Sequence, residues 1–456
     1  MITFVLLLSI LWRTLAAGVF IPNEQSVRRR GAPFDSSREV PRRGKPLSRQ
    51  YLTAYHSRHS KRSLPGEAPI NSAQNGIVYL TPISFGNQSF LSVLDTGSAD
   101  TWLVDEKFSC LDVYSRKPLA RADCKFGPAF DSSASPSFKQ VPDQHFNITY
   151  GDGEFLTGVI GNEDVTLAGI KVRNQTVAVV DYGAWTGDTK SSGLIGLAYP
   201  FATRAYTGNI TRLQRRGVRV PYDPIFTTMW KKGLTAPLFS VALGRTNDEQ
   251  GVLAMGGLPG YPIKYESTFV STPIEYTTIT STLSINASTP AGSQSEYILY
   301  TIKPDNFAFA PQNSAQNITH NTTLKHGPGP IRQTVTTHAT NGKAIIDTGT
   351  TLIFVPDSLA NKINACFTPP SRFDRRNQAY LVDCNAAPPR LGLTISGTTF
   401  WMDPKELVQK VENETFCLSA VQDGGNGTMI VGDVWMKSVV SVFDVGAAEM
   451  RFAKRL

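Results

Sequence analysis

The sequence predicts an all-β protein built from two related lobes. Its 456 residues are 41% hydrophobic and 18% charged, which suffices for two cores and excludes a chain disordered throughout. The 37 Gly and 29 Pro, with frequent Thr, Val and aromatic residues, favour strands and turns over helical arrays. A pattern that occurs once in each half indicates that the lobes are related.

The first 18 residues have the composition of a signal peptide. Residues 4–12 are largely apolar, and small residues follow at 16–18, as is typical of a cleavage region. This stretch is too short to span a bilayer, and no later segment offers about 18 uninterrupted apolar residues. We expect a secreted protein without a membrane anchor, with retention in a vacuole as the open alternative.

Residues 19–62 are basic, rich in Pro and Ser, and lack apolar periodicity, so we expect a propeptide. Residues 1–62 hold 12 of the 45 basic residues but only 3 of the 37 acidic ones. The net charge of +8 therefore comes from this segment, and a nearly neutral body argues against a nucleic-acid partner. The dibasic pair Lys61-Arg62 suits cleavage by a kexin-like convertase.

Asn-x-Ser/Thr sequons follow residue 62 in a number that fits passage through the secretory pathway. The expected glycosylation sites are Asn87, Asn147, Asn174, Asn209, Asn286, Asn317, Asn321, Asn413 and Asn426.

Five cysteines in an oxidising compartment indicate two disulfides and one remaining thiol. Several pairings are open, and the shortest loops favour Cys110 with Cys124 and Cys384 with Cys417. Cys366 would then be a buried, unreactive thiol.

Each half contains a strand-like run that ends in Asp-Thr-Gly and is followed later by two apolar residues and a Gly. The first copy is 95–98 with Leu194-Ile195-Gly196, and the second is 347–350 with Ile430-Val431-Gly432. One copy could be an ordinary turn, because Asp and Gly dominate turns. Two copies indicate that each lobe presents one carboxylate, with an N-terminal lobe at 63–260 and a C-terminal lobe at 261–456.

Paired carboxyls suit peptide hydrolysis without a metal. One takes a proton from water while the other, protonated, hydrogen-bonds the scissile carbonyl. Like charges at this distance do not both ionise easily, so Asp95 and Asp347 would titrate as a unit, and which one starts ionised stays open. Glycines allow the loops to approach, and hydroxyls orient the carboxylates or brace the loops. The expected supporting residues are Thr96, Gly97, Ser98, Thr348, Gly349 and Thr350.

From residue 76 to 453 the chain resembles the pepsin-like aspartic endopeptidases, fungal secreted ones most of all. The resemblance implies a bilobal fold with the active site between the lobes, a monomer, polypeptide substrates and no cofactor. It also implies a flap containing Tyr150 and Gly151, with Tyr150 hydrogen-bonded to Trp102. The basic propeptide would cover the cleft as an intramolecular inhibitor until acid releases it.

Asp152 has two open interpretations. Fungal members with an acidic residue at this flap position accept Lys beside the scissile bond as well as large apolar residues, because a carboxylate can pair with an ammonium. Alternatively, Asp152 only stabilises the hairpin turn.

Other chemistries find little support in the sequence. It has no Gly-x-Ser-x-Gly, no His-Glu-x-x-His, and no metal-ligand spacing among its six His. The alternative from another class is a secreted, glycosylated binding or inhibitor protein that keeps the fold without catalysis. A cell-wall structural role would need tandem repeats, which are absent.

Overall fold

The structure is a computed structural model. It describes residues 47–48, 66–208, 217–245, 249–260, 262–280, 293–312, 335–340, 342–411, 415–425 and 427–456. The expected signal peptide, Lys61-Arg62 and all of the propeptide except 47–48 lie outside the described residues. So do the sequons at Asn209, Asn286, Asn317, Asn321, Asn413 and Asn426. Of the other three, Asn87 and Asn174 are exposed and Asn147 is half-buried.

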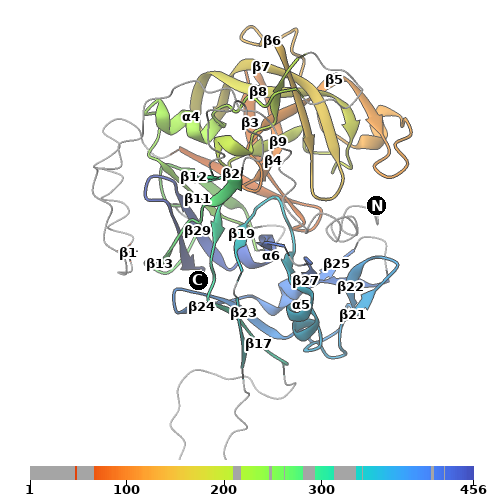
Figure 1. Ribbon diagram of the computed structural model, residues 1–456, viewed down its shortest axis with the longest axis vertical. Coiled ribbons are helices and arrows are strands. Elements are labelled where there is room, and N and C mark those ends of the chain that lie inside the picture. The colour runs from red at the N-terminus through yellow and green to blue at the C-terminus, as the bar shows by residue number, and fades with distance from the viewer. Residues whose placement is uncertain are drawn as a thin grey trace, which may run out of the picture.

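Two lobes of β structure stack on a group of shared strands (Figure 1). Burial alternates along these strands, as in β7 (Phe155–Leu167), because successive side chains point to opposite faces of the sheet. The predicted all-β, two-lobed fold is therefore confirmed. The strands shared between the lobes run in the order β1 (Leu47–Ser48), β13 (Thr268–Pro273), β30 (Glu449–Lys454), β29 (Val439–Asp444), β11 (Leu238–Ala242), β12 (Gly251–Met255) and β2 (Gly66–Ala73).

The N-terminal lobe continues this same 15-stranded sheet beyond β2. Its strands follow in the order β3 (Val78–Phe85), β4 (Gln88–Asp95), β9 (Gly193–Gly196), β5 (Thr101–Leu111), β8 (Ile170–Ala184), β7 (Phe155–Leu167), β6 (Lys139–Thr149) and β10 (Ala205–Thr207).

The C-terminal lobe consists of smaller sheets. One has the order β16 (Thr301–Ile302), β19 (Ala344–Ile346), β28 (Met429–Val431), β20 (Ile353–Val355), β27 (Val421–Asp423). A second has β18 (Thr336–Ala339), β17 (Asn306–Ala310), β23 (Arg390–Ile395), β24 (Thr398–Trp401), and a third has β21 (Arg372–Asp374), β22 (Ala379–Val382), β26 (Cys417–Ser419), β25 (Val408–Lys410). The hairpin β14 (Thr277–Thr280) and β15 (Ser293–Glu296) stands apart.

Helices are few and short in the described residues. They are α4 (Ile225–Lys231), α5 (Asp357–Asn364), α6 (Asp433–Met436), and the 3-10 turns η1 (Arg121–Cys124), η2 (Pro200–Ala202) and η3 (Pro404–Leu407). None of the helices in these residues is long and apolar enough to cross a membrane.

The internal repeat has a direct structural counterpart. In the N-terminal lobe β4 pairs in parallel with β9, which sets Asp95 opposite Gly196. In the C-terminal lobe β19 pairs in parallel with β28, which sets Ile346, the residue before Asp347, opposite Val431. Each apolar-apolar-Gly segment is thus the strand beside the one that delivers an Asp, which explains why the two parts of the pattern recur together.

The structure contains both favoured disulfides, Cys110–Cys124 and Cys384–Cys417. Cys366 is free, as expected, but it is half-buried rather than buried, because it lies just beyond the end of α5. Its partial burial raises the pKa of the thiol, which disfavours the reactive thiolate.

Candidate active site

The two Asp-Thr-Gly loops meet face to face between the lobes. A methyl group added at Gly97 would lie 2.6 Å from the carboxyl group of Asp347, and one added at Gly349 would lie 2.5 Å from Oδ1 of Asp95. Each glycine therefore lies against the carboxyl group of the opposite lobe, where no other residue fits. Asp95 is only 6% exposed and Asp347 only 8%.

Matching hydrogen bonds orient both carboxylates. The Gly97 N–H donates to Oδ1 of Asp95 at 2.6 Å, and the Ser98 hydroxyl donates to Oδ2. In the other loop the Gly349 N–H donates to Oδ1 of Asp347 at 2.8 Å and the Thr350 hydroxyl to Oδ2 at 2.6 Å. The bonds fix the carboxyl planes, as the sequence predicted for the hydroxyls of Ser98 and Thr350.

The threonines of the two motifs tie the lobes together. The Thr96 hydroxyl accepts from the Thr348 N–H at 3.1 Å and donates to the carbonyl of Ile346 at 2.9 Å. In return the Thr348 hydroxyl accepts from the Thr96 N–H at 3.1 Å and donates to the carbonyl of Leu94 at 2.8 Å. Both threonines are at most 2% exposed, so these four bonds form without competition from water.

The environment of the pair favours a proton on it. Burial, and then the charge of Asp347, raise the pKa of Asp95 to about 8, although the hydrogen bonds from Ser98 and Gly97 act in the opposite direction. The carboxyl of Asp95 therefore holds a proton far above the pH at which an exposed Asp loses it. Such a pair offers both a proton acceptor and a proton donor over a wide acidic range.

The expected flap is a hairpin between β6 and β7. Trp102, fully buried at the start of β5, donates from Nε1 to the Tyr150 hydroxyl at 2.8 Å. The turn is closed by the Gly153 N–H, which donates to the Tyr150 carbonyl at 3.1 Å, and Gly151 is exposed at its tip. Asp152 is half-buried, and its Oδ1 accepts from the Glu154 N–H at 2.9 Å.

The sequence did not single out three buried acids around this site. Glu154, 2% exposed, and Asp433, 1% exposed, have pKa values raised well above the usual range, chiefly by burial. Asp433 also responds to the charges of both Asp347 and Asp95. Burial raises the pKa of Asp100 to about 6, and its Oδ1 accepts from the Tyr222 hydroxyl at 2.6 Å. Asp433 follows Gly432 of the repeat, Asp100 precedes Trp102 by two residues and Glu154 follows Asp152 by two, but nothing in the sequence indicated that these acids are buried.

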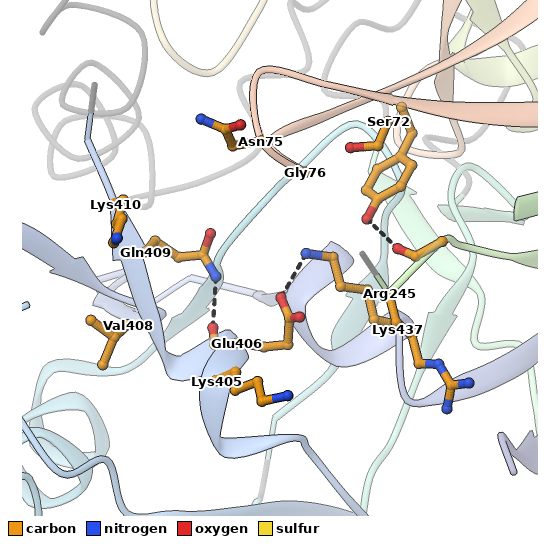
Figure 2. A pocket seen from close by; sticks show the side chains of 12 residues that line it. Ser72, Asn75, Gly76, Arg245, Lys405, Glu406, Val408, Gln409, Lys410 and Lys437 are labelled. Carbon is orange, nitrogen blue, oxygen red and sulfur yellow. Dashed lines mark hydrogen bonds and ion pairs between the residues drawn. The ribbon is translucent and has the colours of Figure 1, made fainter. Parts of the chain in front are cut away.

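A separate cavity of about 440 Å³ lies between β2, the β11–β12 connection and η3, and neither the paired Asp residues nor the flap lines it. Figure 2 shows its buried ion pair, in which Lys437 Nζ lies 2.6 Å from Glu406. Exposed Arg245, Lys405 and Lys410 make the rest of its charged lining basic. The charge of Lys437 partly offsets the rise in the pKa of Asp433, which the charges of Asp347 and Asp95 also affect. The cavity and the Asp pair therefore share one electrostatic neighbour, Asp433.

No group of three His, Cys, Asp or Glu side chains in the described ranges is arranged to hold a metal ion. A family model described as eukaryotic aspartyl protease matches residues 78–455. The chain belongs to this family. Its fold is the pepsin-like one that the two Asp-Thr-Gly motifs predicted.

Fungal relatives agree with this assignment. A probable aspartic-type endopeptidase of Aspergillus fumigatus is 39% identical over 85% of this chain and 81% of its own length. An aspartic protease of Coccidioides posadasii is 25% identical over 93% and 82%, and rhizopuspepsin of Rhizopus chinensis is 23% identical over 85% and 81%. The protein is an aspartic-type endopeptidase. This assignment argues against the alternative of a binding or inhibitor protein that keeps the fold without catalysis.

Proposed function

We propose that this protein is the zymogen of a secreted acid endopeptidase in which Asp95 and Asp347 activate a water molecule. The observation that carries the proposal is the convergence of two buried, identically hydrogen-bonded carboxyls, with the pKa of Asp95 raised to about 8. One carboxylate accepts a proton from water as the oxygen attacks the peptide carbonyl. The other, protonated, hydrogen-bonds the developing oxyanion. As the C–N bond breaks, the first carboxyl passes the proton that it took from the water to the leaving amine, which returns the pair to its starting state.

The zymogen part of the proposal rests on charge and on one strand pair. The segment 19–62 is basic, so it can pair with acidic groups of the body until these are protonated. The backbone of Leu47–Ser48, inside that segment, pairs antiparallel with β13 at the edge of the shared sheet. We propose that this propeptide inhibits the enzyme, that a kexin-like convertase cleaves after Lys61-Arg62, and that the monomeric product is exported or kept in a vacuole.

The zymogen proposal is tested by expressing residues 19–456 in a secretory host and shifting the product from neutral to about pH 4. We expect loss of the segment up to residue 62 and cleavage of an unfolded protein that a statine-type inhibitor blocks, because such inhibitors mimic the tetrahedral intermediate. Asp95→Asn and Asp347→Asn should each abolish cleavage without unfolding the protein. Asp357→Asn, an exposed Asp at the start of α5, is the matched control. Cleavage by a purified Asp95→Asn or Asp347→Asn protein would refute the mechanism.

For substrates we propose large hydrophobic residues beside the scissile bond, and Lys when Asp152 is ionised. The bond from the Glu154 N–H supports the turn-stabilising interpretation of Asp152, but it engages only one carboxyl oxygen. Burial raises the pKa of Asp152, so the carboxylate that could pair with an ammonium forms only as the pH rises.

The two interpretations of Asp152 predict different pH profiles. If Asp152 binds Lys, kcat/KM for a Lys substrate should rise with pH relative to that for a Phe substrate, and Asp152→Asn should remove this rise. An equal loss on both substrates at every pH would show that Asp152 only stabilises the turn. Paired fluorogenic peptides that differ in this one residue make the comparison.

A further inference from the structure

A loop closed by the Cys110–Cys124 disulfide extends toward the flap. The loop folds into a tight turn, in which the Asp112 N–H donates to the Lys117 carbonyl at 2.9 Å and the Arg116 N–H to the Asp112 carbonyl at 3.0 Å. Arg116 itself has φ 57°, a left-handed conformation that is unfavourable for a residue with a side chain. Such local strain persists only where the surrounding contacts hold it.

Arg116 uses this position to contact the flap turn directly. Its Nη2 donates to the carbonyl of Gly153 at 2.9 Å, and its guanidinium lies 4.6 Å from the ring centre of Phe155. The contacts engage the residues on either side of Glu154, where the turn passes into β7. A planar guanidinium can both donate and stack in this way, whereas an ammonium cannot.

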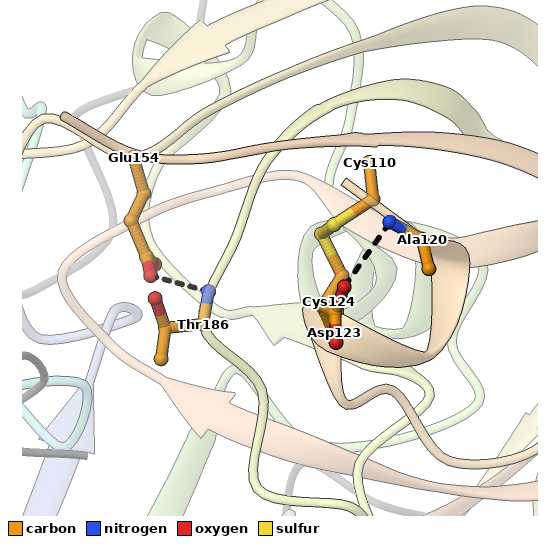
Figure 3. Close-up of a disulfide and its surroundings, with 6 residues drawn as sticks. All are labelled: Cys110, Ala120, Asp123, Cys124, Glu154 and Thr186. Carbon is orange, nitrogen blue, oxygen red and sulfur yellow. Dashed lines mark hydrogen bonds between the residues drawn. A yellow bond between two sulfur atoms is a disulfide. The ribbon is translucent and has the colours of Figure 1, made fainter. Parts of the chain in front are cut away.

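A second link starts at Cys124, where the same loop ends. The carbonyl of Cys124 accepts from the Gly187 N–H at 2.9 Å, and the neighbouring Thr186 N–H donates to Oε1 of Glu154 at 2.7 Å. Figure 3 shows Glu154 and Thr186 facing each other on one side of the disulfide. Residues 153 and 154 are therefore held by hydrogen bonds that lead back to the middle of the disulfide-closed loop, at Arg116, and to its end, at Cys124.

Aromatic packing provides a third link. Phe126, just after Cys124, stacks on Trp185 at 6.0 Å, and Tyr150 lies edge to face with the same Trp185 at 5.7 Å. Trp185 also meets Trp102 at 5.2 Å, so the indole that bonds the Tyr150 hydroxyl belongs to the same cluster. The base of the flap is thus packed against the segment that follows the disulfide.

We propose that the Cys110–Cys124 loop braces the flap and that Arg116 is a positioning residue for catalysis. By holding the Gly153 carbonyl, Arg116 keeps the turn that carries Tyr150 in one position, so substrate binds without first ordering it. This inference rests on the flap function proposed for Tyr150.

The test compares Arg116→Gln with Arg121→Gln, a matched change in the same loop, since Arg121 donates to the carbonyl of Asp105 rather than to the flap. Because Arg116 is an exposed residue, we expect a moderate effect, a rise in KM of about fivefold with kcat within about twofold. Arg116→Lys should recover part of this loss, and Arg121→Gln should behave as wild type. An unchanged KM in Arg116→Gln would overturn the proposal.

A second pair of variants tests the other link. Glu154→Gln keeps an acceptor for the Thr186 N–H and should resemble wild type, whereas Glu154→Leu should raise KM as Arg116→Gln does. If these two variants behave alike, Glu154 has only a packing role and this link is refuted.

Amide hydrogen exchange across residues 150–156 separates this inference from the proposed function, because it needs no turnover. Exchange should be faster in Arg116→Gln than in wild type and unchanged in Arg121→Gln. Faster exchange in Arg116→Gln, combined with a wild-type protein that does not cleave peptides, would support the brace and refute the proposed mechanism. Equal exchange in all three proteins would refute the brace, whatever the activity.

Discussion

The hydroxyl group of Tyr150 makes one of the contacts that join the flap to the core. Tyr150→Phe leaves the buried Trp102 N–H without its acceptor at 2.8 Å, which costs about 1–3 kcal/mol of folding free energy. Because the ring is then less well placed over the substrate, kcat/KM should fall by about tenfold. Steady-state kinetics and thermal unfolding measure the two effects. Tyr114→Phe, on an exposed tyrosine, is the control, and an unchanged kcat/KM in Tyr150→Phe would contradict the flap role.

Residue chemistry was predictable where partners are close in sequence or belong to a motif. Ser98 and Thr350 each follow their Asp by three residues, so a hydroxyl–carboxylate bond could be inferred without knowing the fold. Glu154 and Arg116 could not be found in this way. Glu154 matters because it is buried, and Arg116 matters because it bonds to Gly153, 37 residues further along the chain. Neither the burial nor this contact can be inferred from the sequence near the residue.

At the scale of elements, the Asp loops depend on each other through Thr96 and Thr348. Thr96→Val removes one hydroxyl that both accepts from the Thr348 N–H and donates to the Ile346 carbonyl. Two buried groups lose their partner, so the free energy of unfolding should fall by about 2–4 kcal/mol, and activity should fall with the altered loop geometry. Denaturant titration measures this change. Thr96→Ser keeps the hydroxyl and should lose far less; equal losses would contradict the bracing role.

The approach of the loops predicts that Gly97 cannot be replaced. In Gly97→Ala the new methyl would lie 2.6 Å from the Asp347 carboxyl, closer than atoms can pack, so the lobes must separate. We expect loss of cleavage in a protein that still folds. Gly342→Ala, where the new methyl would meet only Met429 at 3.5 Å, is the matched control. Retained activity in Gly97→Ala would show that the loops are not held this closely during catalysis.

Alternating strands could be predicted from the sequence, whereas the burial of one basic segment could not. Segment 203–224 is rich in arginine, as solvent-exposed insertions often are, but its described part contains β10, which pairs with β6 and buries Ala205 and Tyr206. Arg219 shows how a basic residue fits into such a packed segment. Arg219 lies 4.5 Å from the ring centre of Phe201 and donates to the carbonyl of Thr203 at 3.0 Å, so it packs rather than extends into water.

At the scale of the whole molecule, the sequence predicted two lobes but not the sheet that joins them. The repeat marks one strand pair in each lobe, because both members of each pair carry part of the pattern. The shared strands have no such mark: β2 pairs with β12, and β11 with β29, across long stretches of chain. Pairings of this kind follow from tertiary packing and leave no short-range signal.

The buried acids together predict that the protein is most stable in acid. Burial raises the pKa of Asp95 to about 8 and of Asp100 to about 6, and it also raises those of Glu154 and Asp433. An unfolded chain loses these protons near pH 4, whereas the folded protein keeps them, so the free energy of unfolding falls as the pH rises toward 8. Each proton retained contributes a slope of about 1.4 kcal/mol per pH unit.

Thermal unfolding between about pH 3 and pH 8 tests this prediction, with the highest Tm expected near pH 4. Below that pH the Tm should fall again. Lys171 lowers the pKa of Asp164, and Arg245 and Arg455 lower that of Glu249, through hydrogen bonds and opposite charge. Protonation of these two acids removes the favourable contacts. Glu154→Gln cannot ionise, so its Tm should decline less steeply toward neutral pH, while Asp357→Asn should follow wild type. A Tm that rises from pH 4 to pH 8 would mean that these acids ionise in the folded protein as readily as in the unfolded chain.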